Sequence, residues 1–257
     1  MLVYKYVVPE RIDILENGYL RFSQADALND PFESYPRYDQ FERGLKELRY
    51  AVKGYNPNDI IRRNPRVDKD AQDLRKWFRD KMKSNTLVLS LTKKRNNLVM
   101  WSHYTNAHRG FVIGFDSNNL FFRQKTSRNT GPLAEVEYAD ERVSVPFGKS
   151  VSDELVKVYR KVFFTKSIHW AYEEELRVLS QPSYGKIIGK DNNGLDIYVF
   201  DFPPECLKEI IFGYLSTTEL KRRISEIVAS RYPHVELFEA QPSETDFDLD
   251  IKSYRVP

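Results

Sequence analysis

The sequence predicts a single α+β domain spanning 1–257, built on a mixed and strongly twisted central sheet. Short apolar strands recur along the whole chain, and no regular alternation of strand, helix and strand accompanies them. A chain of 257 residues is also an ordinary length for one mixed domain. The helical patterns at 38–53 and 67–83 are expected to form an insertion at 38–83, on the outside of that domain.

The composition restricts the cellular setting and the partners. The 40 Lys and Arg residues nearly balance the 37 Asp and Glu residues, and both signs are spread along the chain. Nucleic-acid binding is therefore allowed but not indicated. Cys206 is the only cysteine, which excludes an intrachain disulfide and favours a reducing cytoplasm. The first residues do not resemble a signal peptide, and no run of about 20 apolar residues occurs, so we expect a cytoplasmic protein without a membrane partner.

The N-terminal segment predicts two short strands around a helix. One strand is expected at 2–8, where Pro9 closes it, and the other at 20–23. Between them, 11–16 has helical apolar spacing, and Gly18 supplies the C-terminal stop of this helix.

The next loop, 27–33, concentrates polar side chains. Asn29 and Asp30 precede a proline, which favours a turn, and Glu33 follows closely. These three side chains either contribute to a site or, in the case of Asn29 and Asp30, cap the loop through its own backbone. Both interpretations stay open from the sequence.

The centre of the chain reads as a strand, a helix and a second strand. The strands are expected at 86–91 and 111–115, and the helix at 98–104. Helical spacing presses Trp101 and Tyr104 of that helix against a core.

Two histidines, His103 and His108, accompany this aromatic pair close to the helix-to-strand junction. Such a junction holds side chains on a rigid support, which suits the wall of a pocket. Core packing with hydrogen-bonded polar tips is the alternative explanation.

A second stretch with several candidate site residues covers 172–179. If it is extended, Glu173, Glu175 and Arg177 share one face, because side chains alternate across a strand. If it is helical, Glu173 and Arg177 form an ordinary ion pair four residues apart. The residues after Arg177 favour a strand, so we adopt the extended interpretation.

The remaining elements have clear local signals. Residues 191–194 predict a hairpin turn, and Ser216 or Thr217 predicts a helix cap. Further strands are expected at 134–138, 184–188, 197–200, 210–212 and 235–240, and further helices at 153–164 and 217–232.

Several motifs occur together in one bacterial family. They are Tyr4-Lys-Tyr6, Leu20-Arg-Phe-Ser23, Asn29-Asp-Pro-Phe-Glu33, Met100-Trp-Ser-His-Tyr104 with His108 and Gly110, and Lys166 and Trp170 with Tyr172-Glu-Glu-Glu-Leu-Arg177. On these motifs the chain resembles, over nearly its whole length, the family known as domain of unknown function 2971. It departs from the family at Leu176, where Trp is expected. The family label implies no activity.

The order of the motifs is also similar to that of distant ADP-ribosyltransferases: an early strand, a middle motif and a late Glu-x-Glu strand. This second resemblance implies an ADP-ribosyltransferase-like fold and NAD as the substrate. Cleavage of the nicotinamide–ribose bond builds positive charge on the ribose, which a carboxylate stabilises. The absence of a glycine-rich phosphate loop argues against a Rossmann or P-loop enzyme.

The same resemblance implies roles for individual residues. Glu175 would hold the ribose and its charge, Glu173 would orient the nucleophile, and Trp101 or Tyr104 would stack on nicotinamide. Arg177, Lys5 or Arg21 would meet the diphosphate. The implied catalytic residues are Glu175, Glu173 and Tyr104, and the implied cofactor-binding residues are Tyr4, Tyr6, Ser90, Trp101, His108, Arg177 and Asn29.

Such an enzyme would modify a macromolecular acceptor, either protein or nucleic acid. It would suit a toxin or a phage-defence component, with an antitoxin or another partner protein. The stronger alternative is a non-enzymatic ligand-sensing or protein-interaction domain. A metal-dependent hydrolase using His103, His108, Asp30 and Glu33 is the weaker one, because the two histidines lie five residues apart and lack the spacing of a helical zinc motif.

Overall fold

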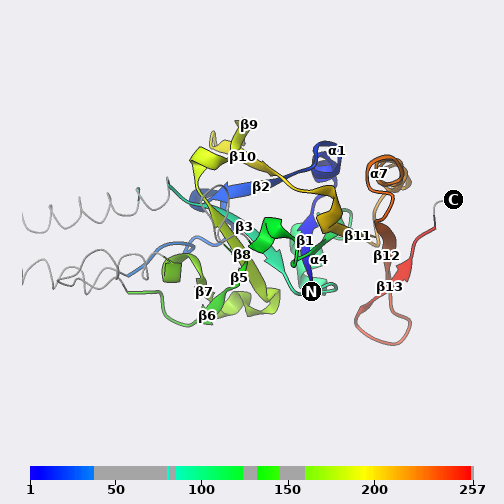
Figure 1. The fold of residues 1–257 in the computed structure, drawn as a ribbon. Coiled ribbons are helices and arrows are strands. Elements are labelled where there is room, and N and C mark those ends of the chain that lie inside the picture. The colour runs from blue at the N-terminus through cyan, green and yellow to red at the C-terminus, as the bar shows by residue number, and fades with distance from the viewer. Residues whose placement is uncertain (38–79, 81–84, 124–131, 145–159, 256–257) are drawn as a thin grey trace, which may run out of the picture. The chain divides into compact units, whose positions relative to one another are not determined.

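The structure is a computed structural model that describes residues 1–37, 80, 85–123, 132–144 and 160–255, and Figure 1 labels its elements. The described strands are β1 (Leu2–Val7), β2 (Tyr19–Gln24), β3 (Leu87–Thr92), β4 (Phe111–Asp116), β5 (Ala134–Glu135), β6 (Glu137–Ala139), β7 (Thr165–Ser167), β8 (Glu175–Ser180), β9 (Lys186–Lys190), β10 (Asp196–Asp201), β11 (Leu207–Phe212), β12 (Glu236–Pro242) and β13 (Leu249–Ser253). The described α-helices are α1 (Asp13–Asn17), α4 (Leu98–Tyr104), α5 (Leu120–Arg123) and α7 (Thr218–Arg231). The described 3₁₀ helices are η1 (Pro9–Ile12), η2 (Ala25–Ala27), η4 (Ile168–Glu173), η5 (Pro182–Tyr184) and η6 (Pro204–Cys206).

The chain separates into two compact units. The first unit comprises Met1–Ser23, Leu87–Glu135 and Tyr172–Pro257, and the second comprises Gln24–Thr86 and Val136–Ala171. Nearly all of the expected insertion at 38–83 lies outside the described residues, so the single domain with a helical insertion stays a prediction.

The first unit is built on one mixed sheet. Among the described residues this sheet has eleven strands, in the order β13-β12-β11-β4-β1-β3-β2-β10-β9, with β8 paired to β3 and β5 paired to β8. Most pairs for which the register is known are antiparallel, whereas β11 and β12 run parallel. The predicted α+β class with a mixed sheet is therefore confirmed. Strand β4, which follows the aromatic residues of α4, and strand β8, which carries Glu175 and Arg177, both belong to this one sheet.

Strand alternation divides the buried side chains between two cores. On β1, Val3 and Val7 pack into the larger core, while Tyr4 and Tyr6 point to the opposite face and join a smaller one. Trp101 of α4 fills the centre of this smaller core and is fully buried, as its helical spacing predicted. The smaller core carries the polar residues of the candidate site.

Helix α7 shows how local sequence signals set an element. Thr217 is the cap, because its hydroxyl oxygen accepts a hydrogen bond of 3.2 Å from the Leu220 backbone N–H. Leu220, Ile224 and Val228 repeat every four residues and are buried. Each such side chain contributes about 1.5–3 kcal/mol through burial. Gly18 likewise ends α1 in the left-handed conformation, at φ 71°.

Some predicted elements differ in extent from the observed ones. The strand expected at 134–138 is two short strands, β5 and β6, interrupted at Val136. β6 pairs with β7 in a separate two-stranded parallel sheet within the second unit. Strand β13 follows the last predicted strand and was not expected. Of the helix predicted at 153–164, only the helical residues 160–163 and the residue after them are described.

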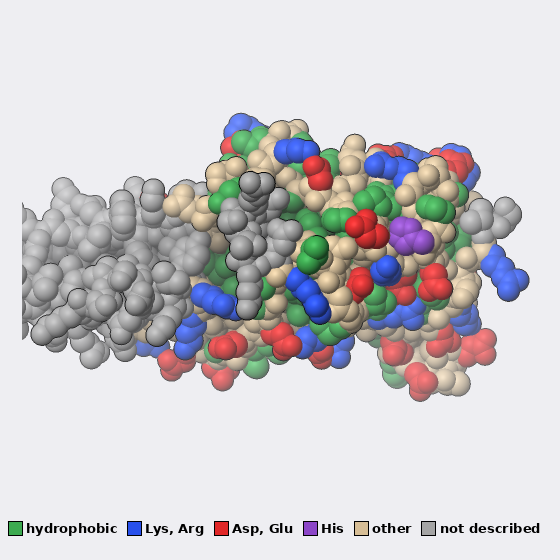
Figure 2. Space-filling model, viewed as in Figure 1, with side chains coloured by type: hydrophobic (Ala, Val, Ile, Leu, Met, Phe, Trp, Pro, Cys, Tyr) green, Lys and Arg blue, Asp and Glu red, His purple; other side chains and the backbone are tan. Residues whose placement is uncertain are grey.

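The described surface carries charges of both signs. Figure 2 shows Lys and Arg side chains interspersed with Asp and Glu on the face in view, rather than a field of one sign. This mixture agrees with the balanced composition. No helix in the described part of the chain has both the length and the apolar character needed to cross a bilayer.

Candidate functional site

The amide side chain of Asn97 joins helix α4 to η4. Its Oδ1 accepts a hydrogen bond of 3.0 Å from the Met100 backbone N–H and so caps α4, while its Nδ2 donates at 3.0 Å to the Tyr172 carbonyl. One side chain thereby fixes the start of α4 against the end of η4. This contact brings Tyr104 to Glu173, and the Tyr104 hydroxyl donates a hydrogen bond to Glu173 Oε1.

A second aromatic pair lies beside this contact. His103 Nδ1 and the Tyr172 hydroxyl are 3.2 Å apart, and the two rings meet edge to face with centroids 6.3 Å apart. His103 is exposed, Tyr172 and Tyr104 are half-buried, and Glu173 is only 3% exposed. The site therefore has a buried carboxylate below and hydrogen-bonding rings at the surface.

The chain turns sharply between Glu173 and Glu175, which corrects the predicted strand at 172–179. Glu173 ends η4, Glu174 adopts a left-handed conformation with φ 41°, and the strand begins only at Glu175. The two carboxylates are consequently not neighbours on one strand face. A left-handed residue interrupts the alternation that the extended interpretation required.

The segment around Glu174 is tied to the residues after β3. The Thr92 hydroxyl donates to the Glu173 carbonyl, and the Lys93 backbone N–H donates to the Glu174 carbonyl at 3.3 Å. Lys94 forms an ion pair with the Glu174 carboxylate at 2.7 Å. These contacts hold the left-handed turn in place.

Glu175 forms a bidentate ion pair with Arg177 on the same face of β8. Arg177 Nε lies 2.7 Å from Glu175 Oε1, and Arg177 Nη2 lies 2.9 Å from Oε2. The side chains are 4% and 1% exposed. The expectation that Arg177 compensates a carboxylate is confirmed for Glu175, but neither group presents a surface to a ligand in this state.

Ser90 and Lys5 lie close to this ion pair. Ser90 is opposite Arg177 in the β3–β8 register, and its carbonyl accepts a hydrogen bond of 3.0 Å from Lys5 Nζ. The pKa of Lys5 is lowered to about 8, first by burial and then by the charge of Arg11, while the charge of Glu175 opposes the shift.

Arg21, the other residue expected at the diphosphate, forms an ion pair with Asp191 at 2.7 Å. Its buried Nε has no hydrogen-bond partner within the described chain. Asp191 therefore binds the guanidinium through Nη2, while no group in the described chain accepts a hydrogen bond from Nε.

Trp101 cannot serve as a stacking platform, which corrects that part of the implied site. The ring is fully buried, its Nε1 donates to Asn96 Oδ1 at 3.2 Å, and Tyr6 packs edge-on at 5.3 Å. A ligand would find no exposed face on this indole. The alternative interpretation of core packing applies to Trp101.

His108 stacks on Trp101 and ends a strained turn. The ring planes are within 10° of parallel, with centroids 6.2 Å apart. Asn106, Ala107 and His108 have φ values of 52°, 51° and 64°, so three consecutive residues other than glycine are left-handed. Burial lowers the pKa of His108, and its buried Nδ1 has no hydrogen-bond partner in the described part of the protein.

Tyr4 and Tyr6 form the inner wall of the smaller core. Tyr4 is 6% exposed, and burial, followed by the charge of Glu209, raises its pKa to about 12. Tyr6 donates a hydrogen bond of 3.2 Å to the Lys94 carbonyl, and burial raises its pKa as well. Both rings support α4 from below, and neither presents an open face to a cofactor.

One ion pair near Tyr4 was not predicted from the sequence. Arg95 binds Glu209 through two contacts of 2.9 and 3.0 Å, although the residues lie 114 positions apart. Gly114 makes room for it, since a Cβ there would lie 2.6 Å from the Glu209 side chain. No local sequence pattern connects these residues.

Several residues of the resemblance motifs belong to the second unit. Asn29 is exposed, whereas Asp30 is buried and its Oδ1 accepts a hydrogen bond of 2.8 Å from the Phe32 backbone N–H. The capping interpretation is therefore confirmed for Asp30. Lys166 Nζ lies 4.9 Å from the centre of the Trp170 ring, a cation–π distance.

The described residues offer little support to the metal-site alternative. Within them, no group of three or more His, Cys, Asp or Glu side chains could hold a metal ion. The arrangement in the first unit instead suits proton transfer, because a half-buried phenol donates to a buried carboxylate beside an exposed imidazole.

Comparison with known proteins supports the first resemblance. Residues 100–178 match a family described as protein of unknown function (DUF2971). The matched segment contains α4 from Met100 onward, the strained turn, β4 and the residues from Lys166 to Arg177. Comparison with curated proteins and with solved structures gives no match to this chain.

Proposed function

We propose that the protein transfers an ADP-ribosyl group from NAD to a macromolecular acceptor, with Tyr104 and Glu173 as the reacting pair. The supporting observation is the hydrogen bond from the half-buried phenol to the buried carboxylate. The order of the sequence motifs supplies the choice of NAD, and an ADP-ribosyltransferase-like fold is part of the same proposal.

The chemistry needs a group that removes a proton from the acceptor. The bond between ribose C1′ and the nicotinamide nitrogen breaks, and nicotinamide leaves with the bonding electrons. The acceptor oxygen or nitrogen then bonds to C1′, its proton passes to the Tyr104 oxygen, and the Tyr104 proton passes to Glu173. The negative charge of Glu173 also stabilises the positive charge that develops on the ribose.

This proposal assigns the central role to Glu173 rather than Glu175. Glu175 is neutralised by Arg177 through two short contacts, and its carboxylate is almost completely buried. Glu173 instead accepts a hydrogen bond from Tyr104, whose half-buried ring lies next to His103. His103 and Tyr172 would contact the acceptor or the nicotinamide.

The test measures NAD consumption and label transfer with purified wild type and candidate protein and nucleic-acid acceptors. Glu173→Gln and Tyr104→Phe are each expected to lower turnover about 100-fold or more, the usual contribution of general acid–base catalysis. Glu174→Gln is the matched control, because this neighbour is exposed and pairs only at the surface with Lys94. Folding is checked by circular dichroism. Folded wild type that neither binds nor consumes NAD would refute the proposal.

A non-enzymatic sensing or interaction domain is the second candidate function. Two observations favour it: the closed Glu175–Arg177 pair and the complete burial of Trp101, both of which fit a structural polar core. Calorimetry with NAD distinguishes the candidates. Binding without consumption in the presence of the candidate acceptors would favour the sensor.

A further inference from the structure

The sheet of the first unit ends in two edge strands, β9 and β13. The pairing of β9 with β10 shifts register within the strand, and β9 has a lysine at each end, Lys186 and Lys190. Bulges and lysines of this kind hinder an edge strand from pairing with another chain. β13 pairs with β12 without such a shift, and no strand of the described chain lies beyond it in the sheet. A row of its backbone N–H and C=O groups therefore faces outward and can pair with a further strand.

Phe247 lies next to this edge, in the loop 243–248 that joins β12 to β13. Its side chain is fully exposed. The loop is nevertheless held by hydrogen bonds: the Ser243 backbone N–H donates to the Asp248 carbonyl at 3.0 Å, and Ser243 Oγ accepts at 3.4 Å from the Asp246 backbone N–H. An aromatic ring presented on a fixed loop offers a large contact area at a small cost in conformational entropy, as anchor residues of protein interfaces do.

Asn96 connects the base of this loop to the candidate site. Its Nδ2 donates to Asp248 Oδ1 at 2.8 Å, and its Oδ1 accepts from Trp101 Nε1 of α4 at 3.2 Å. The loop is thereby fixed near the start of α4, whose seven residues span about 10 Å. A partner bound at the loop is therefore within reach of the candidate site.

The charge of the loop selects the kind of partner. Glu244, Asp246 and Asp248 form no ion pair with any cation of the described chain. In β13, Asp250 Oδ2 lies 4.0 Å from Lys252 Nζ, at the limit of an ion pair. Figure 2 shows Asp and Glu side chains gathered at the lower right, where Figure 1 places this loop. Carboxylates repel the phosphates of nucleic acids and attract Lys and Arg, so charge complementarity favours a basic protein segment.

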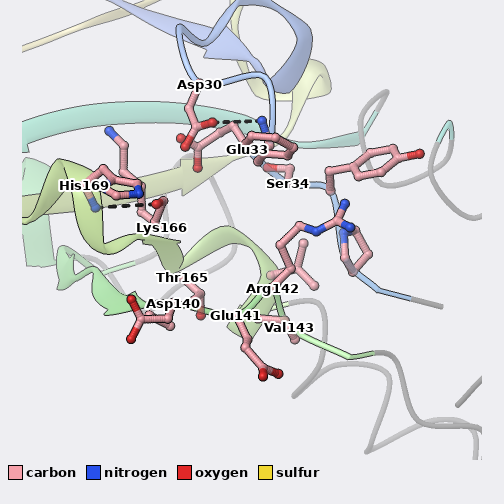
Figure 3. Close-up of a pocket in the computed structure, with 16 residues that line it drawn as sticks. Asp30, Glu33, Ser34, Asp140, Glu141, Arg142, Val143, Thr165, Lys166 and His169 are labelled. Carbon is pink, nitrogen blue, oxygen red and sulfur yellow. Dashed lines mark hydrogen bonds between the residues drawn. The ribbon is translucent and has the colours of Figure 1, made fainter. Parts of the chain in front are cut away.

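The cavity of the second unit does not suit such a partner. It has a volume of about 270 Å³, and Asp30 and Thr165 lie on opposite sides of it (Figure 3). Pockets for small molecules begin at roughly 300 Å³. Five residues of extended chain span about 17 Å and need an open edge instead. Among the described elements of the first unit, β13 provides such an edge without a shift in its register.

We propose that β13 and the loop 243–248 bind an extended, basic segment of a partner protein. The segment adds a strand to the outer edge of β13, and its backbone groups pair with those of β13. One apolar side chain of the segment packs on the Phe247 ring, and its Lys or Arg side chains meet the carboxylates of the loop. The inference does not depend on the transferase proposal, because it concerns binding alone and an interaction domain would use the same surface.

The experiment titrates the full chain into a fluorescein-labelled octapeptide of alternating Lys and Val and measures fluorescence anisotropy. Three probes are compared with it: an octapeptide of alternating Glu and Val, single-stranded oligothymidine, and the Lys-Val peptide N-methylated at two adjacent central residues. The Lys-Val peptide is expected to bind with a micromolar dissociation constant, whereas the Glu-Val peptide and the DNA give no binding. N-methylation blocks backbone pairing on both edges of the peptide and should weaken binding about tenfold or more.

Two variants connect binding to this surface. Phe247→Ala should weaken binding of the Lys-Val peptide about tenfold or more, and the fold should persist because the ring is fully exposed. Leu120→Ala is the matched control, since this side chain of α5 is 70% exposed elsewhere on the first unit. The double variant Glu244→Gln with Asp246→Asn removes two charges, so it should weaken binding several-fold and reduce its dependence on salt. Circular dichroism checks the folding of each variant.

The proposal is overturned if the folded wild type does not bind the Lys-Val peptide, or if the N-methylated peptide binds equally well. It is also overturned if Phe247→Ala binds as tightly as Leu120→Ala. Tighter binding of the oligothymidine than of the Lys-Val peptide would replace the protein partner by a nucleic acid. None of these titrations contains NAD, so their outcome is separate from that of the transferase test.

Discussion

Arg177 donates two hydrogen bonds to the Glu175 carboxylate, from Nε at 2.7 Å and from Nη2 at 2.9 Å, and both side chains are almost inaccessible to solvent. The residues alternate onto the same face of β8, so no turn or loop is needed to bring them together. Desolvating two charges is costly, and their pairing with good geometry offsets that cost. This pair is therefore a structural element of the smaller-core face.

Glu175→Gln should consequently destabilise the protein. The substitution is nearly isosteric, but it leaves the Arg177 charge buried without its carboxylate, a change that costs about 3–5 kcal/mol. Urea denaturation measures the difference in the free energy of unfolding. Glu174→Gln removes a carboxylate one residue away at an exposed ion pair and should cost about 1 kcal/mol or less. Equal losses in the two variants would contradict the structural role of the buried pair.

In the strained turn before β4, we expect a substitution to stabilise the protein. Ala107 holds φ 51°, and a left-handed conformation costs a residue with a Cβ about 1–2 kcal/mol. Ala107→Gly removes this strain, and after the greater flexibility of glycine in the unfolded chain is deducted, it should stabilise the protein by about 0.5–1 kcal/mol. Ala229→Gly, at an exposed position in α7, should instead destabilise it by about 1 kcal/mol. The two denaturation midpoints should therefore move in opposite directions.

Gly213 lies against the same turn. A Cβ at this position would lie 2.2 Å from the His108 carbonyl oxygen, and backbone atoms cannot yield as a flexible side chain can. Gly213→Ala should therefore shift the turn and cost about 3 kcal/mol or more. Gly194→Ala is the comparison: its Cβ would meet no atom within 4 Å, and only the left-handed φ of 77° opposes the substitution. Thermal denaturation should show a clearly larger loss for Gly213→Ala.

Much of the first unit could be predicted from the sequence because its signals are local. Helix α4 was predicted at the same residues, since its apolar spacing is regular and Gly110 follows closely. Gly18 likewise marked the end of α1 through its left-handed conformation, and the start of α7 was predicted at Ser216 or Thr217, of which Thr217 is the cap. Such signals depend on a few neighbouring residues and do not need the rest of the fold.

The parts that escaped prediction depend on distant contacts or on single dihedral angles. The left-handed Glu174 separates Glu173 from Glu175, and a non-glycine residue with φ 41° has no clear sequence signature. Strand β13 is defined by pairing with β12 rather than by its own alternation. For the candidate site, the sequence singled out Tyr104, Glu173 and Arg177, but it could not show that Trp101 is buried on both faces.

The pH dependence of stability provides a test of the environment of Lys5. Its pKa is lowered to about 8 from a model-peptide value near 10.5, through burial first and then the charges of Arg11 and Arg21, against the opposing effect of Glu175. Below pH 8 both the folded and the unfolded chain hold this proton, so the unfavourable charge is fully present. Between about pH 8 and 10.5 the unfolded chain binds more protons than the folded one at this site, so the Lys5 contribution to stability rises with pH.

The stability of the wild type relative to Lys5→Met should therefore increase over that interval, as measured by urea denaturation in half-unit steps. Lys252→Met, at an exposed position in β13, is the control and should show no such trend. A wild-type advantage that stays constant or falls between pH 8 and 10.5 would mean that the Lys5 ammonium is well solvated, and the contact of Nζ with the Ser90 carbonyl would then be a surface interaction.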